Sequence, residues 1–262
     1  MASSSIQCCT IDNIKWHPFA PGHAIKDSIA ILFINTKSHK SLINNYQNIL
    51  SKEEINKSYS YQLAFKKEHY LVSRCLIKIL LGVYLDRSYN TIQLLPGNTG
   101  KPKVSNQSTL HYSVSYSADY MLLAIATDEV GVDIECIRHD FHFQEIVDFS
   151  FHSCEQDFIR QHADPSRSFF TLWTRKEALV KATSKGIDDD FNTIPSLDGF
   201  HLIDQANLHT SIDWTTSSFT IGTDCIGAIS CPSGFTSKDI SFYTVDIIPS
   251  VLNNSSSQPS HK

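Results

Sequence analysis

The chain has 262 residues, 41% of them hydrophobic, which is enough material for one large domain or two small ones. Its formal net charge of -5 argues against broad nucleic-acid binding. No apolar run approaches the roughly 18 residues of a membrane span, and the N-terminus lacks the basic and apolar regions of a secretory signal. We therefore expect neither a nucleic acid nor a membrane as a partner.

The cysteines are distributed along the chain without the paired spacing of a zinc site. There are seven, an odd number: Cys8, Cys9, Cys75, Cys136, Cys154, Cys225 and Cys231. Most of them lie in apolar segments, as Cys75 and Cys225 do. We expect reduced thiols that pack as small hydrophobic side chains in a cytoplasmic protein.

The N-terminal part of the chain begins without a regular pattern. Residues 1–25 contain two prolines and a glycine and are predicted to be irregular. Residues 28–36 follow as a β-branched apolar run, and this composition predicts a strand.

The segment 51–85 contains no proline, and its single glycine falls near its end. It predicts two helices with a break near Ser60. Ser51 followed by Glu54 has the spacing of a capping box and indicates the start of the first helix. Residues 94–104 then carry turn signals and a basic tip.

The second part of the chain alternates between strand and helix patterns. Residues 108–137 alternate in polarity and predict two or three strands. Residues 143–162 and 166–185 are predicted to be helical, and the last third of the chain predicts further strands. Residues 249–262 are polar and low in complexity, and we expect them to be disordered.

A weak internal repeat is visible between residues 74–78 and residues 177–181. Each segment follows a helical stretch and each precedes predicted strands. Two amphipathic helices can resemble each other by chance, and on this pattern alone we favour that explanation. A genuine repeat would instead indicate two similar α+β halves joined near residue 127.

The segment GVDIE, residues 131–135, places two carboxylates on one face of a predicted strand. Asp133 and Glu135 are two residues apart, so their side chains point the same way while Val132 and Ile134 point the other way. Such acids usually form a solvated face. Alternatively they share a divalent cation, because Mg²⁺ is commonly held by one or two carboxylates together with substrate phosphates.

The predicted helix at 169–186 carries charged side chains on and beside its apolar face. Lys176 falls in the middle of that face, and Glu177 and Lys181 share one ridge with Trp173 because of their spacing of four. An ordinary ion pair would explain Glu177 and Lys181, and a snorkelling stem would explain Lys176. A phosphate ligand would supply the anion that a lysine on an apolar face normally needs.

Together these two segments resemble the signature of 4′-phosphopantetheinyl transferases, closest to the surfactin-synthetase-activating type. Every fixed position of that signature is filled: Gly131, Asp133, Glu135, Trp173, Lys176, Glu177 and Lys181. The segment Gly100-Lys101-Pro102 is similar to a loop of the same family, and the resemblance covers about residues 50 to 230.

Two positions depart from the family pattern in the predicted strand after that loop. A family histidine that helps to bind the nucleotide end of coenzyme A is Tyr116 here, and a family asparagine is Ser113. Tyrosine can donate a hydrogen bond but cannot become cationic at neutral pH. Lys103, His111 or Lys67 are the candidates to compensate.

The resemblance implies an α+β fold, a pseudo-dimer of two similar α+β halves with the active site in the cleft between them. We expect an N-terminal half over residues 1–127 that contributes to coenzyme A binding. The C-terminal half over residues 128–248 would carry the metal-binding acids and the signature helix, ahead of the tail at 249–262.

The resemblance also implies a reaction. The family transfers the 4′-phosphopantetheine group from coenzyme A to a serine of an apo acyl or peptidyl carrier protein and releases 3′,5′-ADP. Mg²⁺ would be held by Asp133, Glu135 and Glu177. A carrier protein and coenzyme A are the implied partners, and we expect a monomer. The alternatives are a non-catalytic module of the same fold that binds coenzyme A or the carrier, and a Mg²⁺-dependent phosphohydrolase.

The family roles carry over to individual residues as follows. Glu177, Lys181 and Lys176 are the expected catalytic residues, with Lys181 on the phosphates and Lys176 orienting Glu177 or binding phosphate. Either Glu177 or a metal-bound water accepts the serine proton. The expected coenzyme A contacts are Lys101, Ser115, Tyr116, Arg74 and Lys181.

Overall fold

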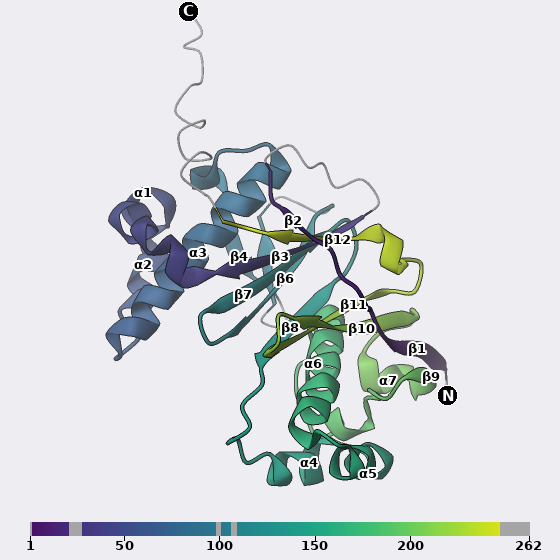
Figure 1. Cartoon of the computed structure of the whole chain (residues 1–262). Coiled ribbons are helices and arrows are strands. Elements are labelled where there is room, and N and C mark those ends of the chain that lie inside the picture. Colours follow the sequence, from purple (N-terminus) through teal and green to yellow (C-terminus); the bar gives the residue numbers. More distant parts are fainter. Residues whose placement is uncertain (1, 21–27, 98–100, 106–108, 247–262) are drawn as a thin grey trace, which may run out of the picture.

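Two five-stranded mixed sheets, each flanked by helices, make up most of the protein (Figure 1). The computed structural model describes residues 2–20, 28–97, 101–105 and 109–246. The predicted α+β class and two-part organisation are confirmed. Gly100 of the expected loop and the tail at 249–262 lie outside the described residues.

The first sheet is built mainly from the N-terminal part of the chain. Its order is β2-β12-β3-β7-β6, with β3 antiparallel to β7 and parallel to β12. Its strands are β2 (Trp16–Pro18), β12 (Ile240–Thr244), β3 (Ile29–Asn35), β7 (Tyr120–Ala126) and β6 (His111–Ser117). The strand predicted at 28–36 is therefore confirmed as β3.

The second sheet is built mainly from the C-terminal part. Its order is β8-β11-β10-β1-β9, so that β8 is an edge strand, as β6 is in the first sheet. Its strands are β8 (Gly131–Cys136), β11 (Cys225–Pro232), β10 (Trp214–Ile221), β1 (Ser3–Thr10) and β9 (Gly199–Asp204).

The two ends of the chain are exchanged between the sheets. β1 pairs with β9 and β10 in the second sheet, and β12 pairs with β3 in the first. The prediction that residues 1–25 are irregular was wrong for β1 and β2. Ser4, Ile6 and Cys8 alternate inward along β1, but the strands that pair with it come some 200 residues later, where no local pattern points to them. The expected boundary near residue 127 separates β7 from β8 along the chain.

Helices cover the outer faces of the sheets. The helices are α1 (Tyr46–Ile49), α2 (Lys52–Ser58), α3 (Ala64–Leu85), α4 (Gln144–Ser150), α5 (Ser153–Gln161), α6 (Pro165–Thr183) and α7 (Gln205–Leu208). A small hairpin is formed by β4 (Leu94–Pro96) and β5 (Pro102–Val104). No helix within the described ranges combines the length and the apolar character needed to cross a membrane.

The two predicted helices at 51–85 are confirmed as α2 and α3. Ser51 caps α2 as the capping-box pattern indicates: its hydroxyl accepts a hydrogen bond from Glu54 N at 3.3 Å, and the Glu54 carboxylate accepts one from Ser51 N at 2.9 Å. Both donors are amides that the helix itself cannot satisfy. The cap therefore separates α2 cleanly from the short helix before it.

The core is continuous across the two sheets because β3 and β7 are buried on both faces. Leu123 and Ile125 of β7 pack under α3, whereas Leu122 and Ala124 pack toward β8 and β11. A strand that is buried on both faces needs apolar side chains at every position. This explains the unbroken run of apolar residues in β7 and seats β8 beside the first sheet.

Helix α6 packs directly against the start of β8. A Cβ atom added to Gly131 would overlap the Ala178 carbonyl oxygen and the Ala182 amide nitrogen of α6. Both are backbone atoms, so no side-chain rotation can relieve the overlap. The glycine therefore sets the approach of α6 to β8, and with it the distance between the acids of β8 and the side chains of α6.

Gly131→Ala should lower the free energy of unfolding by about 3 kcal/mol, because the added methyl group forces the α6 and β8 backbones apart. Urea denaturation measures the difference. Gly234→Ala is the matched control, since nothing lies within 4 Å of the added Cβ, and it should change stability by less than about 0.5 kcal/mol. Equal losses in the two variants would contradict the role assigned to Gly131.

Candidate active site

Two carboxylates lie where the edges of the two sheets meet. Asp133 Oδ1 on β8 accepts a hydrogen bond from Ser115 Oγ on β6 at 2.6 Å. Glu135 Oε2 accepts one from Ser117 Oγ at 2.9 Å. The predicted same-face placement of the two acids is thus confirmed, and the face they share is covered by β6 rather than by open solvent.

Helix α6 brings a third carboxylate and a lysine to this point. Lys181 Nζ donates hydrogen bonds to Asp133 Oδ1 at 2.6 Å and to Ser115 Oγ at 3.0 Å. Glu177, one turn earlier on α6, has no hydrogen-bond or ion-pair partner among the described residues. Burial and the neighbouring charge of Asp133 raise the pKa of Glu177 to about 7. We call Asp133, Glu135 and Glu177 the acidic cluster.

The acidic cluster carries more negative charge than its surroundings balance. Burial raises the pKa of Asp133, although Lys181 opposes the shift, and burial together with Asp133 raises the pKa of Glu135. One lysine faces three carboxylates. An additional cation would relieve this imbalance, and a carboxylate kept partly protonated near neutral pH would be free to exchange a proton.

The donor atoms of the acidic cluster suit a hard cation such as Mg²⁺, which prefers oxygen ligands. Asp133 Oδ2 is buried without a hydrogen-bond partner, and such an atom normally has one. Within the described residues, no three His, Cys, Asp or Glu side chains are already arranged closely enough to hold a metal ion, and Lys181 already bonds Asp133 Oδ1. A cation would therefore compete with Lys181 for Asp133.

Two adjoining cavities open beside the acidic cluster. The smaller, about 240 Å³, is lined by Glu177 and Lys181 of α6 and by Lys101. The larger, about 1030 Å³, is lined by Arg74 and Tyr116. Pro102 and Val114 line both cavities, so the cavity beside α6 adjoins the one beside α3.

Lys101 lies in the smaller cavity but is held by protein groups. Its Nζ donates to Glu129 Oε2 and to the Val130 carbonyl oxygen, both at 2.9 Å. Burial lowers the pKa of Lys101, and Glu129 opposes the shift. His111 and Lys101 together hold the pKa of Glu129 down to about 2. An arriving anion would meet Lys101 already oriented by Glu129.

Arg74 and Tyr116 lie on the wall of the larger cavity. The Arg74 guanidinium donates two hydrogen bonds to Glu54 Oε1, at 2.6 and 3.0 Å. Tyr116 is 39% exposed and meets the ring of His69 edge to face, with centroids 5.3 Å apart. The structure thus brings Lys181, Ser115 and the acidic cluster together, and places Arg74 and Tyr116 in the neighbouring cavity.

Comparison with known proteins finds a family match for part of the chain. The profile of the 4′-phosphopantetheinyl transferase superfamily matches residues 129–227, the region that holds β8 and α6. The matched segment is less than half of the chain. The 4′-phosphopantetheinyl transferase HetI of Nostoc is 23% identical to the chain over 225 residues, which cover 82% of the chain and 92% of HetI.

Two further relatives support the assignment to these transferases. The 4′-phosphopantetheinyl transferase gsp of Aneurinibacillus migulanus is 29% identical over 61% of the chain and 67% of gsp. The Synechocystis protein slr0495, which carries the same transferase name provisionally, is 31% identical over 59% of the chain. The chain spans 65% of the length of slr0495. These matches support the predicted family and enzyme class.

Lys176 is not brought to the acidic cluster. It is fully buried on another face of α6, and its Nζ pairs with Glu155 Oε2 at 2.8 Å and donates to the Ile194 carbonyl oxygen. The anion that this lysine needs is therefore a glutamate of α5, not a phosphate. Successive helix positions point about 100° apart, so Lys176 points away from the side of α6 that carries Glu177. Its expected role in the reaction stays a prediction.

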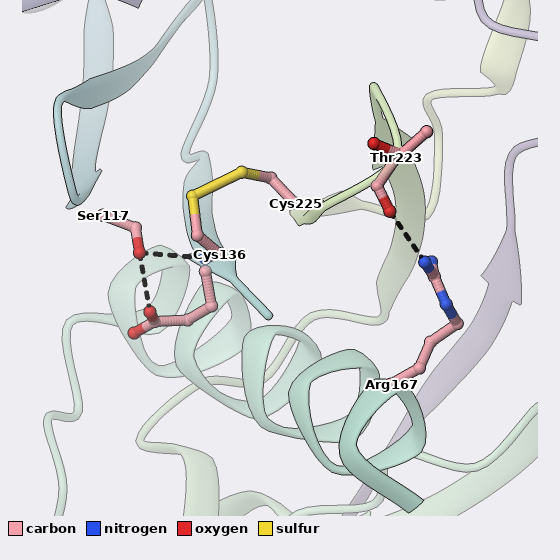
Figure 2. The surroundings of a disulfide bond; sticks show 6 residues. Ser117, Cys136, Arg167, Thr223 and Cys225 are labelled. Carbon is pink, nitrogen blue, oxygen red and sulfur yellow. Dashed lines mark hydrogen bonds between the residues drawn. A yellow bond between two sulfur atoms is a disulfide. The ribbon is translucent and has the colours of Figure 1, made fainter. Parts of the chain in front are cut away.

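The protein contains a disulfide between Cys136 and Cys225, so the expectation of reduced thiols was wrong for these two residues (Figure 2). The antiparallel register of β8 and β11 places them directly opposite each other, with Cα atoms 4.1 Å apart. Burial raises the pKa of the Cys8, Cys75 and Cys231 thiols to about 12. These three are buried free thiols, as predicted.

The sequence reasoning missed residues that act through partners distant in the chain. Ser117, Glu129 and Glu155 each contact a residue of the predicted site or signature. The alternation of Ser113, Ser115 and Ser117 was visible and indicated a polar strand face. Nothing in the local pattern identified the residues opposite, since these depend on how the sheets and α5 pack.

Lys176→Met should lower the free energy of unfolding by about 3 kcal/mol or more, because it leaves the Glu155 carboxylate buried without its cation. Adding Glu155→Gln to the Lys176→Met variant should recover part of the lost unfolding free energy, because the neutral amide needs no cation. Urea denaturation and single-turnover transfer on the same preparation separate stability from catalysis. Unchanged stability with lost transfer would return Lys176 to the catalytic group.

The metal-free protein should become less stable as the pH rises from about 4.5 to about 7. Glu177 has its ordinary pKa of 4.5 when unfolded and about 7 when folded, so the folded state binds the proton more tightly and loses this advantage on deprotonation. Thermal melts in chelator measure the slope. Glu177→Gln should reduce it, and an unchanged slope would contradict the raised pKa.

Proposed function

We propose that this transferase moves the 4′-phosphopantetheine group of coenzyme A onto a serine hydroxyl of an apo acyl or peptidyl carrier protein and releases 3′,5′-ADP. The observation that supports the proposal is the pair of adjoining cavities. The smaller is lined by Lys181 and by Glu177 of the acidic cluster, and the larger is lined by Arg74 and Tyr116. A reactive centre and room for a nucleotide therefore adjoin each other.

Mg²⁺ is the cofactor that we propose for the acidic cluster. Asp133, Glu135 and Glu177 would hold it, and the unpartnered Asp133 Oδ2 supports this donor set. When bound, the cation supplies charge neutralisation on the pyrophosphate of coenzyme A. The protein contributes the orientation of the carboxylates, which Ser115 and Ser117 hold from β6.

Lys181 and Glu177 perform the steps that the chain itself supplies. Lys181 lines the smaller cavity, and its ammonium group would donate hydrogen bonds to the phosphate that is transferred or released. Glu177 would accept the proton of the carrier serine through its carboxylate, which faces the smaller cavity. Both side chains line the smaller cavity and can reach the same substrate.

The nucleotide end of coenzyme A would lie toward the larger cavity. Lys101 lines the smaller cavity, Arg74 lines the larger one, and Ser115 bonds Asp133 and Lys181 of the site. We expect these three side chains to contact the phosphates nearest the nucleotide. Tyr116, which stands where the family has a histidine, would offer a phenol hydroxyl. The site takes residues from both halves of one chain, which supports activity as a monomer.

Transfer onto a carrier tests the proposed function. The protein is incubated with coenzyme A, Mg²⁺ and a panel of apo carriers from fatty-acid, polyketide and nonribosomal-peptide synthesis, and each carrier is weighed by mass spectrometry. We expect a mass gain of one phosphopantetheine group on at least one carrier. Asp133→Asn should abolish it, because a charged cation ligand is lost.

Asp128→Asn is the matched control for Asp133→Asn, since it removes an exposed carboxylate on the turn just before β8 and should leave transfer intact. Coenzyme A binding without a mass gain on any carrier would instead support a binding module. Release of phosphate in the absence of a carrier would support a phosphohydrolase. Full transfer in excess chelator would refute the proposed requirement for Mg²⁺.

A further inference from the structure

Serine hydroxyls replace backbone pairing where β6 meets β8. The two strands are edges of different sheets. Val132 N donates a hydrogen bond to Ser113 Oγ at 3.1 Å, and Cys136 N donates one to Ser117 Oγ at 2.9 Å. A buried edge amide needs such a partner, because an unpaired amide costs free energy comparable to a lost hydrogen bond. The serines of β6 therefore close the seam between the two halves.

Ser117 uses its hydroxyl for a second contact. The Cys136 amide occupies an acceptor position of Ser117 Oγ, and the hydroxyl has only one hydrogen to donate. That hydrogen goes to Glu135 Oε2 at 2.9 Å (Figure 2). The amide therefore directs the hydroxyl toward the carboxylate. Ser113 receives the equivalent amide, but among the described hydrogen bonds it donates to no carboxylate.

The amide that directs Ser117 is itself held in place. Cys136 is paired with Cys225 in the antiparallel register of β8 and β11 and is joined to it by the disulfide. Ser117 lies in register with Tyr120 across the β6–β7 hairpin. Both partners of the hydroxyl thus come from β8, which is fixed to β11, while the hydroxyl comes from a short hairpin of the other sheet.

We propose that Ser117 is a positioning residue for Glu135, which it holds in the orientation that binds the catalytic cation. Ser117 occupies Oε2, so the carboxylate can offer Oε1 to the cation without rotating freely. A hydrogen bond to a ligating carboxylate typically raises metal affinity by about 10- to 100-fold. This inference rests on the proposed metal site and concerns only how one of its ligands is oriented.

Direct titration with Mn²⁺, followed by electron paramagnetic resonance, tests the inference without relying on activity. Ser117→Thr and Ser117→Val have nearly the same shape and differ in the hydroxyl, and both suit a strand. We expect Ser117→Thr to bind Mn²⁺ as the wild type does and Ser117→Val to bind about 10-fold more weakly. The Mg²⁺ concentration that half-activates transfer should rise by the same factor.

Ser113→Val is the control for the structural part of the seam. It removes the hydroxyl that accepts the Val132 amide, so it should lower the melting temperature while leaving Mn²⁺ affinity unchanged. Ser117→Val added to Glu135→Gln should weaken Mn²⁺ binding no further than Glu135→Gln alone, because the serine acts through this carboxylate.

The possible outcomes separate this inference from the proposed function. Absence of Mn²⁺ binding by the wild type refutes the metal site itself. Wild-type affinity in Ser117→Val, or affinity in Ser117→Thr as weak as in Ser117→Val, overturns the role of Ser117. Circular dichroism checks that each variant is folded. If the Ser117→Val variant does not fold, Ser117→Ala, which adds no volume, takes its place in the comparison with Ser117→Thr.

Discussion

The site depends on the burial of Asp133 and Glu135 between two sheet edges. A carboxylate taken out of water must find hydrogen-bond donors or cations, or it becomes protonated. Here β6 supplies a hydroxyl to each acid and α6 supplies Lys181 to one of them. The remaining negative charge is what makes the cleft receptive to a cation. The seam between β6 and β8 is therefore both a structural joint and the floor of the site.

The exchange of chain ends keeps this seam closed. β1 belongs to the sheet of the C-terminal half, and β12 belongs to the sheet of the N-terminal half (Figure 1). The halves cannot move apart without breaking strand pairing in both sheets. The shared core on the inner faces of β3 and β7 adds to this restraint. The acids of β8 and the serines of β6 thus meet although they belong to different sheets.

Helix α6 divides its charged residues between two environments. Glu177 and Lys181 face the smaller cavity, whereas Lys176 is buried and pairs with Glu155 Oε2. Glu155 Oε1 accepts hydrogen bonds from the amide and the hydroxyl of Ser196. Removing either member of this pair would leave an uncompensated charge in the core. The signature segment therefore presents Glu177 and Lys181 to the cavity on one face and holds α5 and the following loop on another. Gly131 permits the close approach that both functions require.

Local patterns along the chain were enough to predict the helices at 51–85 with their cap, the paired acids of β8, the ridge that carries Glu177 and Lys181, and the family. Each of these depends on residues a few positions apart, whose side chains lie on one face of a helix or strand. Tertiary structure decided which groups those faces meet. Ser117 and Glu135 are 18 residues apart and Cys136 and Cys225 are 89 apart, while β1 pairs with strands near the other end of the chain. Such contacts depend on the order and register of the strands. Strand order and register are set by the packing of the complete sheets, so no single segment of the sequence determines them.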